Sequence, residues 1–403
     1  MSLKKAVISL TSLKALDFLF PLALIPLSIN IIGIDNYGKI AFFQTLTLFF
    51  LTIIDFGFVV SGIQKISVCK SYRIVSNYIS ASIVIKVYIA IICSFFFILI
   101  SVFSPFYNEI YIIIVFTITI LFGVGNFQWF YQAKERYRFI LFVSLFSRSF
   151  SFILFFVLIN ERSDYELFSI VLSTMYVIPS IIYIIERLSD GSEFKINHKY
   201  VFLIFKNNFD IFLYRVLNAG VLPFYTYCFG FIFSPHQLGA FSLIQRFLGA
   251  AINFSSPITQ ALIPHLAKLK DNNILYYRVE FKKFRLRLFA FSVIITVLIP
   301  CIIYLCVKLQ LLSGGIRLEY LYLPIIMVLS LSPHILNSFL SQSLVLMGKG
   351  NYVKKIIIKA IIVSTPMIVF SLLFNHNLLV FSYVLTYWLM LLLFEIKNKQ
   401  VFK

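Results

Sequence analysis

The chain has 403 residues, of which 60% are hydrophobic and only 13% are charged. An ordinary soluble domain has about 45–50% apolar and about 25% charged residues, so these proportions exclude a soluble enzyme and a disordered chain. The net charge is +19, from 35 Lys and Arg against 16 Asp and Glu. Such an excess suggests nucleic acid in a soluble protein, but here the distribution of the cations must decide its meaning.

Long apolar segments run through the whole chain and predict an all-α integral membrane protein with 12 transmembrane helices. Each segment is long enough for the roughly 20 residues that cross a bilayer. The runs are continuous, unlike the roughly 10-residue alternating segments of a membrane barrel. Prolines inside several of them predict kinked helices. The predicted spans are 12–34, 38–62, 75–103, 110–133, 138–160, 166–186, 207–232, 238–263, 286–308, 318–346, 355–375 and 378–396.

Segments rich in basic residues and segments with few of them alternate between successive predicted spans. If the N-terminus is cytoplasmic, 27 of the 35 Lys and Arg fall in cytoplasmic segments. The outer loops hold four, which are Lys39, Arg162, Lys308 and Arg317. Because cytoplasmic loops of membrane proteins carry an excess of Lys and Arg, the pattern predicts that both termini are cytoplasmic. Most of the positive charge therefore indicates membrane topology and not nucleic-acid binding.

A hydrophilic stretch at about 187–206 divides the spans into two sets of six. We therefore expect an N-terminal six-helix lobe at 1–190, a cytoplasmic linker at 191–206 and a C-terminal six-helix lobe at 207–403. A weak internal repeat agrees with this division. Gly38 precedes Gln44 by six residues in span 2, and Gly239 precedes Gln245 by six residues in span 8. Halves of six helices would run parallel, related by an axis along the membrane normal.

Four cations interrupt the apolar runs, where each costs at least about 2.5–3.5 kcal/mol near the bilayer centre. They are Lys86, Arg148, Arg215 and Arg246. Such residues usually face a bundle interior or a water-filled cavity. Three acids lie nearer the ends of spans 1, 2 and 7. They are Asp17, Asp55 and Asp210.

Helical phase, at about 100° per residue, groups polar side chains with these charges. One face of span 7 carries Asn207, Asn208, Asp210, Tyr214, Arg215 and Asn218. One face of span 8 carries Gln245, Arg246, Asn253, Ser256, Thr259 and Gln260. In span 2, the angular positions of Gln44 and Asp55 around the helix axis differ by only about 20°. The simplest explanation for polar faces on several spans is that they line one water-filled cavity. A structural contact is the alternative for Lys86 and Arg148, and a helix cap or lysine pair is the alternative for Asp55 and Asp210.

The chain lacks the motifs of a soluble active site. It has no P-loop, no GxSxG and no HExxH, and its five cysteines form no CxxC pair. We therefore expect no catalytic residue, no metal site and no cofactor. Transport would draw on an ion gradient, the membrane potential or the substrate gradient.

Two segments resemble signatures of bacterial polysaccharide flippases of the O-antigen (Wzx) type. The sequence WFYQAKERY from Trp129 to Tyr137 resembles the end of their fourth helix, and Arg148 lies downstream as an arginine often does in those proteins. Asp55-Phe56-Gly57-Phe58 with Ser61-Gly62, after Tyr37-Gly38 and Gln44, resembles their second helix. By length, span number and 6+6 organisation, the resemblance covers essentially the whole chain.

The resemblance implies the MATE-like fold of the MOP superfamily, with two lobes that rock between inward- and outward-facing states. The implied cargo is an undecaprenyl-pyrophosphate-linked oligosaccharide, a unit of O-antigen in lipopolysaccharide or of a similar surface polysaccharide. It would move from the cytoplasmic to the periplasmic leaflet of the bacterial inner membrane. Other implied partners are the lipid bilayer, a coupling ion (H⁺ or Na⁺) and a polysaccharide polymerase or chain-length protein, with no nucleic acid.

On this interpretation Arg215 and Arg246 contact the pyrophosphate, because fixed positive charge counts for more in a low-dielectric cavity than in water. The other candidates for substrate binding are Asn218, Gln245, Asn253, Gln44, Lys86 and Arg148. The candidates for ion coupling or gating are Asp17, Asp55 and Asp210.

Three other functions stay open at this point. A multidrug or toxin extruder of the same superfamily would favour an acidic cavity for cationic compounds, whereas the charges inside the spans are mostly cationic. A membrane polysaccharide polymerase would usually display a long outer loop, but the predicted outer loops are all short. A scaffold without transport activity would have little use for charges that are costly to bury.

Overall fold

The computed structural model describes residues 20, 23–69, 71–189, 197–272, 274–308, 321–347, 349–374 and 377–401. Every regular element in these ranges is a helix. Eight segments of the described chain are long and apolar enough to cross a membrane, which confirms the predicted all-α membrane class. They are Ile34–Ser67, Tyr72–Val102, Ile110–Ala133, Tyr137–Leu158, Arg162–Leu188, Tyr276–Leu305, Tyr322–Leu344 and Leu378–Gln400.

The chain forms two compact units, residues 1–231 and 232–403, which we call the N-terminal and C-terminal units. The helix α9 (His198–Ile232) belongs to the N-terminal unit over nearly its whole length. The predicted six-helix lobes, divided by a linker at 191–206, stay a prediction.

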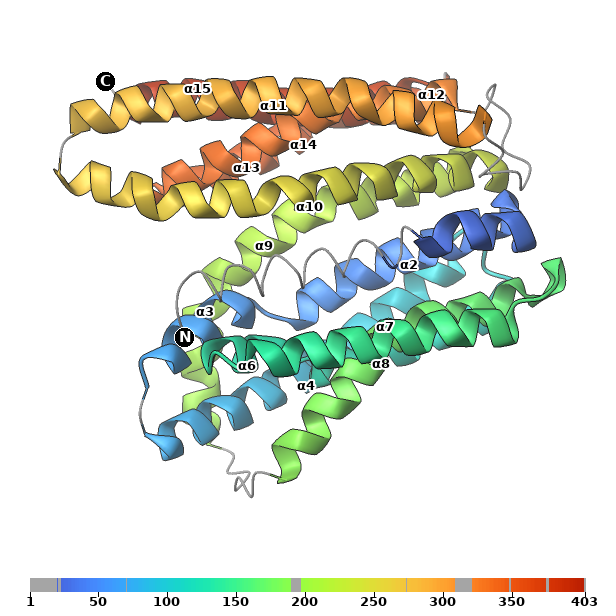
Figure 1. Ribbon diagram of the computed structural model, residues 1–403, viewed down its shortest axis with the longest axis horizontal. Helices are drawn as coiled ribbons and strands as arrows, with labels where there is room; N and C mark the ends of the chain where they lie inside the picture. Colours follow the sequence, from blue (N-terminus) through green and yellow to red (C-terminus); the bar gives the residue numbers. More distant parts are fainter. Residues whose placement is uncertain are drawn as a thin grey trace. The chain divides into compact units, whose positions relative to one another are not determined.

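In the N-terminal unit, α7 lies beside α8 (Figure 1), α5 packs on α4 and α8, and α2 packs on α4 and α5. A short apolar helix, Ala23–Ile32, precedes the labelled elements. The others are α2 (Ile34–Ile54), α3 (Phe58–Ser67), α4 (Tyr72–Val102), α5 (Ile110–Phe122), η1 (Gly123–Gly125), α6 (Gln128–Ala133), α7 (Tyr137–Leu158), η2 (Arg162–Asp164), α8 (Tyr165–Ser189) and α9.

In the C-terminal unit, small polar side chains join neighbouring helices, as they do in many membrane bundles. The Ser292 and Ser332 hydroxyls are 2.7 Å apart, and the Ser343 hydroxyl donates to Asn398 Oδ1 at 2.6 Å. The elements are α10 (Pro235–Asn272), α11 (Ile274–Lys308), α12 (Tyr322–Ile326), η4 (Met327–Ser330), α13 (Leu331–Leu346), α14 (Gly350–Leu373) and α15 (Leu378–Val401).

Each predicted span from the second to the twelfth coincides with a helix, but several helices are longer than their apolar runs. Helices also extend into the hydrophilic segment between predicted spans 8 and 9, since α10 continues to Asn272 and α11 begins at Ile274. Likewise α9 begins at His198, nine residues before the predicted start. Hydropathy marks only the part of a helix that suits lipid, whereas the backbone hydrogen bonds of a helix can continue into water.

Two spans of the N-terminal unit are interrupted at glycines, whereas the sequence predicted kinks at prolines. The first break separates α2 from α3 at Asp55–Gly57, and the second is η1, between α5 and α6. Phe56 (φ 45°) and Gly57 (φ 78°) take left-handed conformations at the first break. Pro179 and Pro223 lie within α8 and α9, and the kinks predicted there stay a prediction.

An aromatic cluster connects these breaks. The Trp129 ring of α6 stacks on the Phe58 ring of α3 at 5.7 Å between centroids and packs edge to face on Tyr78 of α4 at 6.1 Å. Trp129 can approach α3 because residue 62 is glycine, since a Cβ there would lie 2.5 Å from the Trp129 ring. The two segments that carry the family resemblance therefore pack directly on each other.

We predict that Gly62→Ala destabilises the protein by about 1–3 kcal/mol, the usual cost of overpacking a close-packed interior. The added methyl group would overlap a ring that is held on several sides. Thermal unfolding of the purified chain in detergent measures the effect.

Gly249→Ala in α10 is the matched control, because a Cβ at Gly249 would have no neighbour within 4 Å. In a helix interior this exchange stabilises by roughly 0.5–1 kcal/mol. Equal melting temperatures for Gly62→Ala and wild type would contradict the packing described here.

Candidate functional site

The first helix break brings together an acid and a base that are 160 residues apart in the chain. The Asp55 carboxylate at the end of α2 accepts a hydrogen bond from the Arg215 guanidinium of α9. The exposed fractions of the two side chains are only 12% and 26%. A backbone amide, that of Val59, lies 3.5 Å from the same carboxylate oxygen. The structure thus joins two of the sequence-predicted site residues directly.

Aromatic packing holds α9 against the break. The Phe56 ring, 1% exposed, stacks on Phe205 and Phe212 of α9 at 4.8 and 4.5 Å between centroids. A Cβ at Gly57 would lie 3.0 Å from the Ile211 side chain, so only a glycine fits closely there. The left-handed φ of Gly57 requires the same residue type. These contacts hold α9 against the break and so position the Arg215 side chain beside the Asp55 carboxylate.

Lys86 of α4 is completely buried beside this pair. Its Nζ donates to the Asn126 carbonyl at 2.8 Å, which satisfies an acceptor at the second helix break. The same Nζ lies 5.4–6.0 Å from the ring centroids of Phe58, Phe127 and Trp129. Asp55 and Arg215 are the charged groups that act electrostatically on it. In this conformation Lys86 therefore has a structural contact, and its proposed role toward a substrate stays a prediction.

The remaining predicted residues of the N-terminal unit lie on α2, α7 and α9. Arg148 donates to the Ser144 carbonyl and hydroxyl one turn earlier in α7, at 3.1 and 2.9 Å. Gln44 is buried in α2, whereas Asp210 and Asn218 of α9 are exposed.

The predicted residues of the C-terminal unit all lie on α10. Gln245 is buried, Arg246 is partly buried, and the Asn253 amide donates to the Gly249 carbonyl at 2.7 Å. Their association with Arg215 in one cavity stays a prediction. Asp17 lies outside the described residues.

The segment from Trp129 to Tyr137 forms α6, a turn and the start of α7. The Tyr131 ring stacks on Tyr183 of α8 at 5.1 Å, and its hydroxyl donates to the Glu186 carboxylate. Arg136 pairs with the other oxygen of Glu186 at 2.5 Å. The signature therefore secures a tight turn between two membrane helices, which is a structural role.

The two ends of the N-terminal unit differ in how their cations are used. At the predicted outer end, Lys39 pairs with Glu109 at 2.5 Å and Arg162 pairs with Asp35 at 3.3 Å. At the predicted cytoplasmic end Arg136 pairs with Glu186, whereas no ion pair among the described residues involves Lys65, Arg73, Lys134 or Arg138. The predicted orientation stays a prediction.

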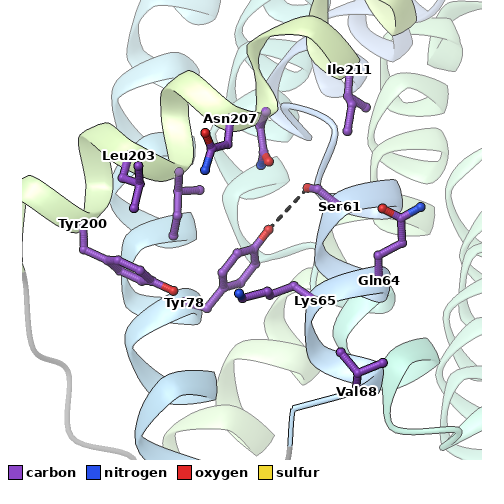
Figure 2. Close-up of a pocket in the computed structure, with 11 residues that line it drawn as sticks. Ser61, Gln64, Lys65, Val68, Tyr78, Tyr200, Leu203, Asn207 and Ile211 are labelled. Atoms are coloured by element: carbon purple, nitrogen blue, oxygen red, sulfur yellow. Dashed lines mark hydrogen bonds between the residues drawn. The ribbon is translucent and has the colours of Figure 1, made fainter. Parts of the chain in front are cut away.

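The structure adds a pocket that the sequence did not predict. It has a volume of about 430 Å³ and lies among α3, α4 and the first half of α9. Its lining includes polar residues that were not candidates, namely Ser61, Gln64, Lys65, Tyr78, Tyr200, Asn207 and Asn208 (Figure 2). Asn207 and Asn208 lie on the polar face predicted for span 7, which is the one signal that could have found it.

Within the described residues, no group of three or more His, Cys, Asp or Glu side chains could hold a metal ion. The chemistry available at the site is that of one half-buried ion pair, one buried amine and a set of neutral amides and hydroxyls. Such groups bind and release polar ligands.

The fold is that of membrane transporters of the MOP superfamily. A multidrug resistance MATE family transporter in an outward-facing conformation superposes with a TM-score of 0.54 over 99% of this chain and 96% of its own, at 13% identity. A MOP superfamily transporter from Pyrococcus furiosus, described as having a binding pocket of reversed polarity, gives the same TM-score and coverage at 12% identity. At such identities the similarity establishes the fold alone.

The chain belongs to the family described as "Polysaccharide biosynthesis protein", whose sequence model matches residues 3–270. It is 24% identical over 277 residues to a "Putative O-antigen transporter" of Escherichia coli K12, an alignment that covers 66% of this chain and 65% of that relative. A Shigella dysenteriae protein of the same name is 23% identical over 73% of this chain and 74% of its own length. The family resemblance inferred from the two signatures is confirmed.

We predict that Asp55 and Arg215 are energetically coupled. In a double-mutant cycle with Asp55→Asn and Arg215→Gln, the coupling free energy should be at least about 1 kcal/mol, within the usual 0.5–3 kcal/mol for interacting side chains. Each single substitution leaves its partly buried partner without a counter-charge. Thermal unfolding in detergent gives the four stabilities.

The Asp35–Arg162 pair supplies a matched cycle, because it joins the same residue types with side chains that are 40% and 67% exposed. Exposed pairs couple by about 0.2–1 kcal/mol, less at high salt. If the coupling at Asp55–Arg215 were no larger than in this control cycle, the pair would not stabilise the helix break.

Proposed function

We propose that the protein is a flippase that moves undecaprenyl-pyrophosphate-linked oligosaccharide units from the cytoplasmic to the periplasmic leaflet of the inner membrane by alternating access. Membership of a polysaccharide biosynthesis family and the MOP fold support this proposal. The half-buried Asp55–Arg215 pair carries it, because it places a releasable cation inside a membrane helix bundle.

The proposed role of Arg215 follows from the chemistry of pyrophosphate. A guanidinium binds phosphate oxygens in bidentate geometry and stays charged at any physiological pH. While Asp55 holds Arg215, that cation is neutralised. Cargo would therefore compete with Asp55 for the guanidinium, and Arg246 of α10 remains a proposed second cation for the pyrophosphate.

Asp55 is proposed as the gating residue. When the carboxylate is ionised, Asp55, Arg215 and Lys86 together carry one net positive charge, and neutralising Asp55 would raise this to two. A proton on Asp55 would thus favour binding of an anionic headgroup, and its loss would favour release. Asp17 and Asp210 remain proposed alternatives for coupling, with H⁺ or Na⁺ as the ion.

The test is export of surface polysaccharide in a deletion strain that carries variants of this chain. We expect Arg215→Ala and Arg246→Ala each to lower export about tenfold or more, the effect of losing one charge-assisted hydrogen bond. Membrane levels of each variant are measured in parallel by immunoblot. Lipid-linked repeat units should accumulate on the cytoplasmic leaflet of the deletion strain.

Arg162→Ala is the control arginine, because its ion pair is exposed and lies at the opposite end of the same unit. Its export should equal that of wild type. Normal surface glycan in both Arg215→Ala and Arg246→Ala would refute the role assigned to these cations.

The two alternative functions predict other phenotypes. A multidrug extruder would leave surface glycan intact in the deletion strain and change its sensitivity to cationic drugs. A polysaccharide polymerase would leave single repeat units on the outer surface. The similarity to O-antigen transporters and the cationic character of the charges inside the predicted spans favour the flippase over both.

A further inference from the structure

The pocket among α3, α4 and α9 has no part in the role given to Arg215, so its own chemistry is informative. Its walls present two aromatic hydroxyls, one serine hydroxyl, three carboxamides and one ammonium group. Figure 2 shows Ser61, Gln64 and Lys65 on one side, Tyr200, Leu203 and Asn207 on the other, and Tyr78 between them. Neutral groups that both donate and accept hydrogen bonds outnumber the single cation.

One side chain in this pocket lacks a hydrogen bond it could make. Asn208 is 4% exposed and its side chain interacts with the Tyr78 hydroxyl, but its buried Nδ2 makes no hydrogen bond of ordinary geometry. An unmade bond at a buried donor costs free energy, so such groups call for an explanation. The terminal torsion of asparagine is broad, and a small rotation would turn Nδ2 toward a ligand in the pocket.

Tyr78 fixes the back of the pocket. It is 4% exposed, its hydroxyl lies 3.3 Å from the Ser61 hydroxyl, and its ring packs on Trp129. It is therefore a rigid wall that belongs to the aromatic cluster described above. A preformed pocket of this volume lies within the range of small-ligand sites.

We propose that this pocket binds one sugar residue of the glycan cargo, a hexose-type ring that is neutral or carries one acidic group. Carboxamides and hydroxyls match the alternating donors and acceptors of sugar hydroxyls, and the Tyr78 and Tyr200 rings offer apolar faces. Lys65 alone, which is exposed, makes a poor site for a phosphate. The proposal rests on the proposed function, since it assigns a sugar subsite at the predicted cytoplasmic end of the N-terminal unit.

The test uses the full chain in detergent with Trp388→Phe, which leaves Trp129 as the one tryptophan of the two in the sequence. Trp129 touches the pocket wall through Tyr78, so its fluorescence reports occupancy. The probes are N-acetylglucosamine, galactose, rhamnose and glucuronic acid, with glycerol 3-phosphate representing a lipid headgroup. Equilibrium dialysis with radiolabelled sugar measures binding independently of fluorescence. For a ligand of about 12 non-hydrogen atoms, we expect a millimolar dissociation constant.

At least one sugar should bind saturably, and Asn208→Leu should weaken it about tenfold. Asn207→Leu changes an exposed residue of the same wall and should weaken binding without affecting folding. Asn108→Leu, an exposed asparagine at the other end of the unit, should bind as wild type does. Lys65→Gln should weaken glucuronic acid and leave neutral sugars unchanged. Melting temperatures show which variants fold.

Three results would overturn the proposal. They are no saturable sugar binding by either method, unchanged affinity in both Asn207→Leu and Asn208→Leu, and binding of glycerol 3-phosphate alone with dependence on Lys65. The export assay separates this outcome from failure of the flippase function. If Arg215→Ala abolishes export while the two asparagine variants export and bind normally, the flippase function is supported and the sugar subsite is refuted.

Discussion

The interruption of a membrane helix at Asp55–Gly57 is the feature on which the N-terminal unit depends. A break exposes polar backbone groups at a depth where lipid offers no hydrogen bonds, so the protein itself must cover them. Here α9 covers the break with the Phe205 and Phe212 rings and with the Arg215 guanidinium. The second break, at η1, receives the Lys86 amine at the Asn126 carbonyl.

The contacts that cover the two helix breaks connect the structure to the proposed transport. In the proposed mechanism the Arg215 guanidinium would pair either with the Asp55 carboxylate, as it does in this structure, or with an anionic ligand. The left-handed conformations of Phe56 and Gly57 turn the backbone between α2 and α3. The pocket beside Tyr78 lies on the same helices, so a ligand there would act on the segment that carries Asp55.

The family signatures acquire a physical meaning in this fold. Gly62 and Phe58 of the helix-2 pattern receive Trp129 of the helix-4 pattern. Tyr131 and Arg136 then attach the following turn to Glu186 of α8. The segments that reveal the family thus maintain the scaffold, whereas Asp55, at the start of one signature, also pairs with a residue outside both. This is why the family could be identified from the sequence more securely than the cargo.

The sequence alone determined the membrane class, the approximate spans and the family, because hydropathy and short signatures depend only on residues that are close together in the chain. It also singled out Arg215 and Lys86 as costly cations in apolar runs, and Asp55 as an acid nearer the end of a span. Only the tertiary structure decided that Asp55 pairs with Arg215, that Lys86 is enclosed by three rings and that Asn208 lines a pocket. Those facts depend on packing between helices far apart in the chain, where a glycine in one helix sets how closely another can approach. Helical phase places a side chain on a face, but it does not choose the helix that the face meets.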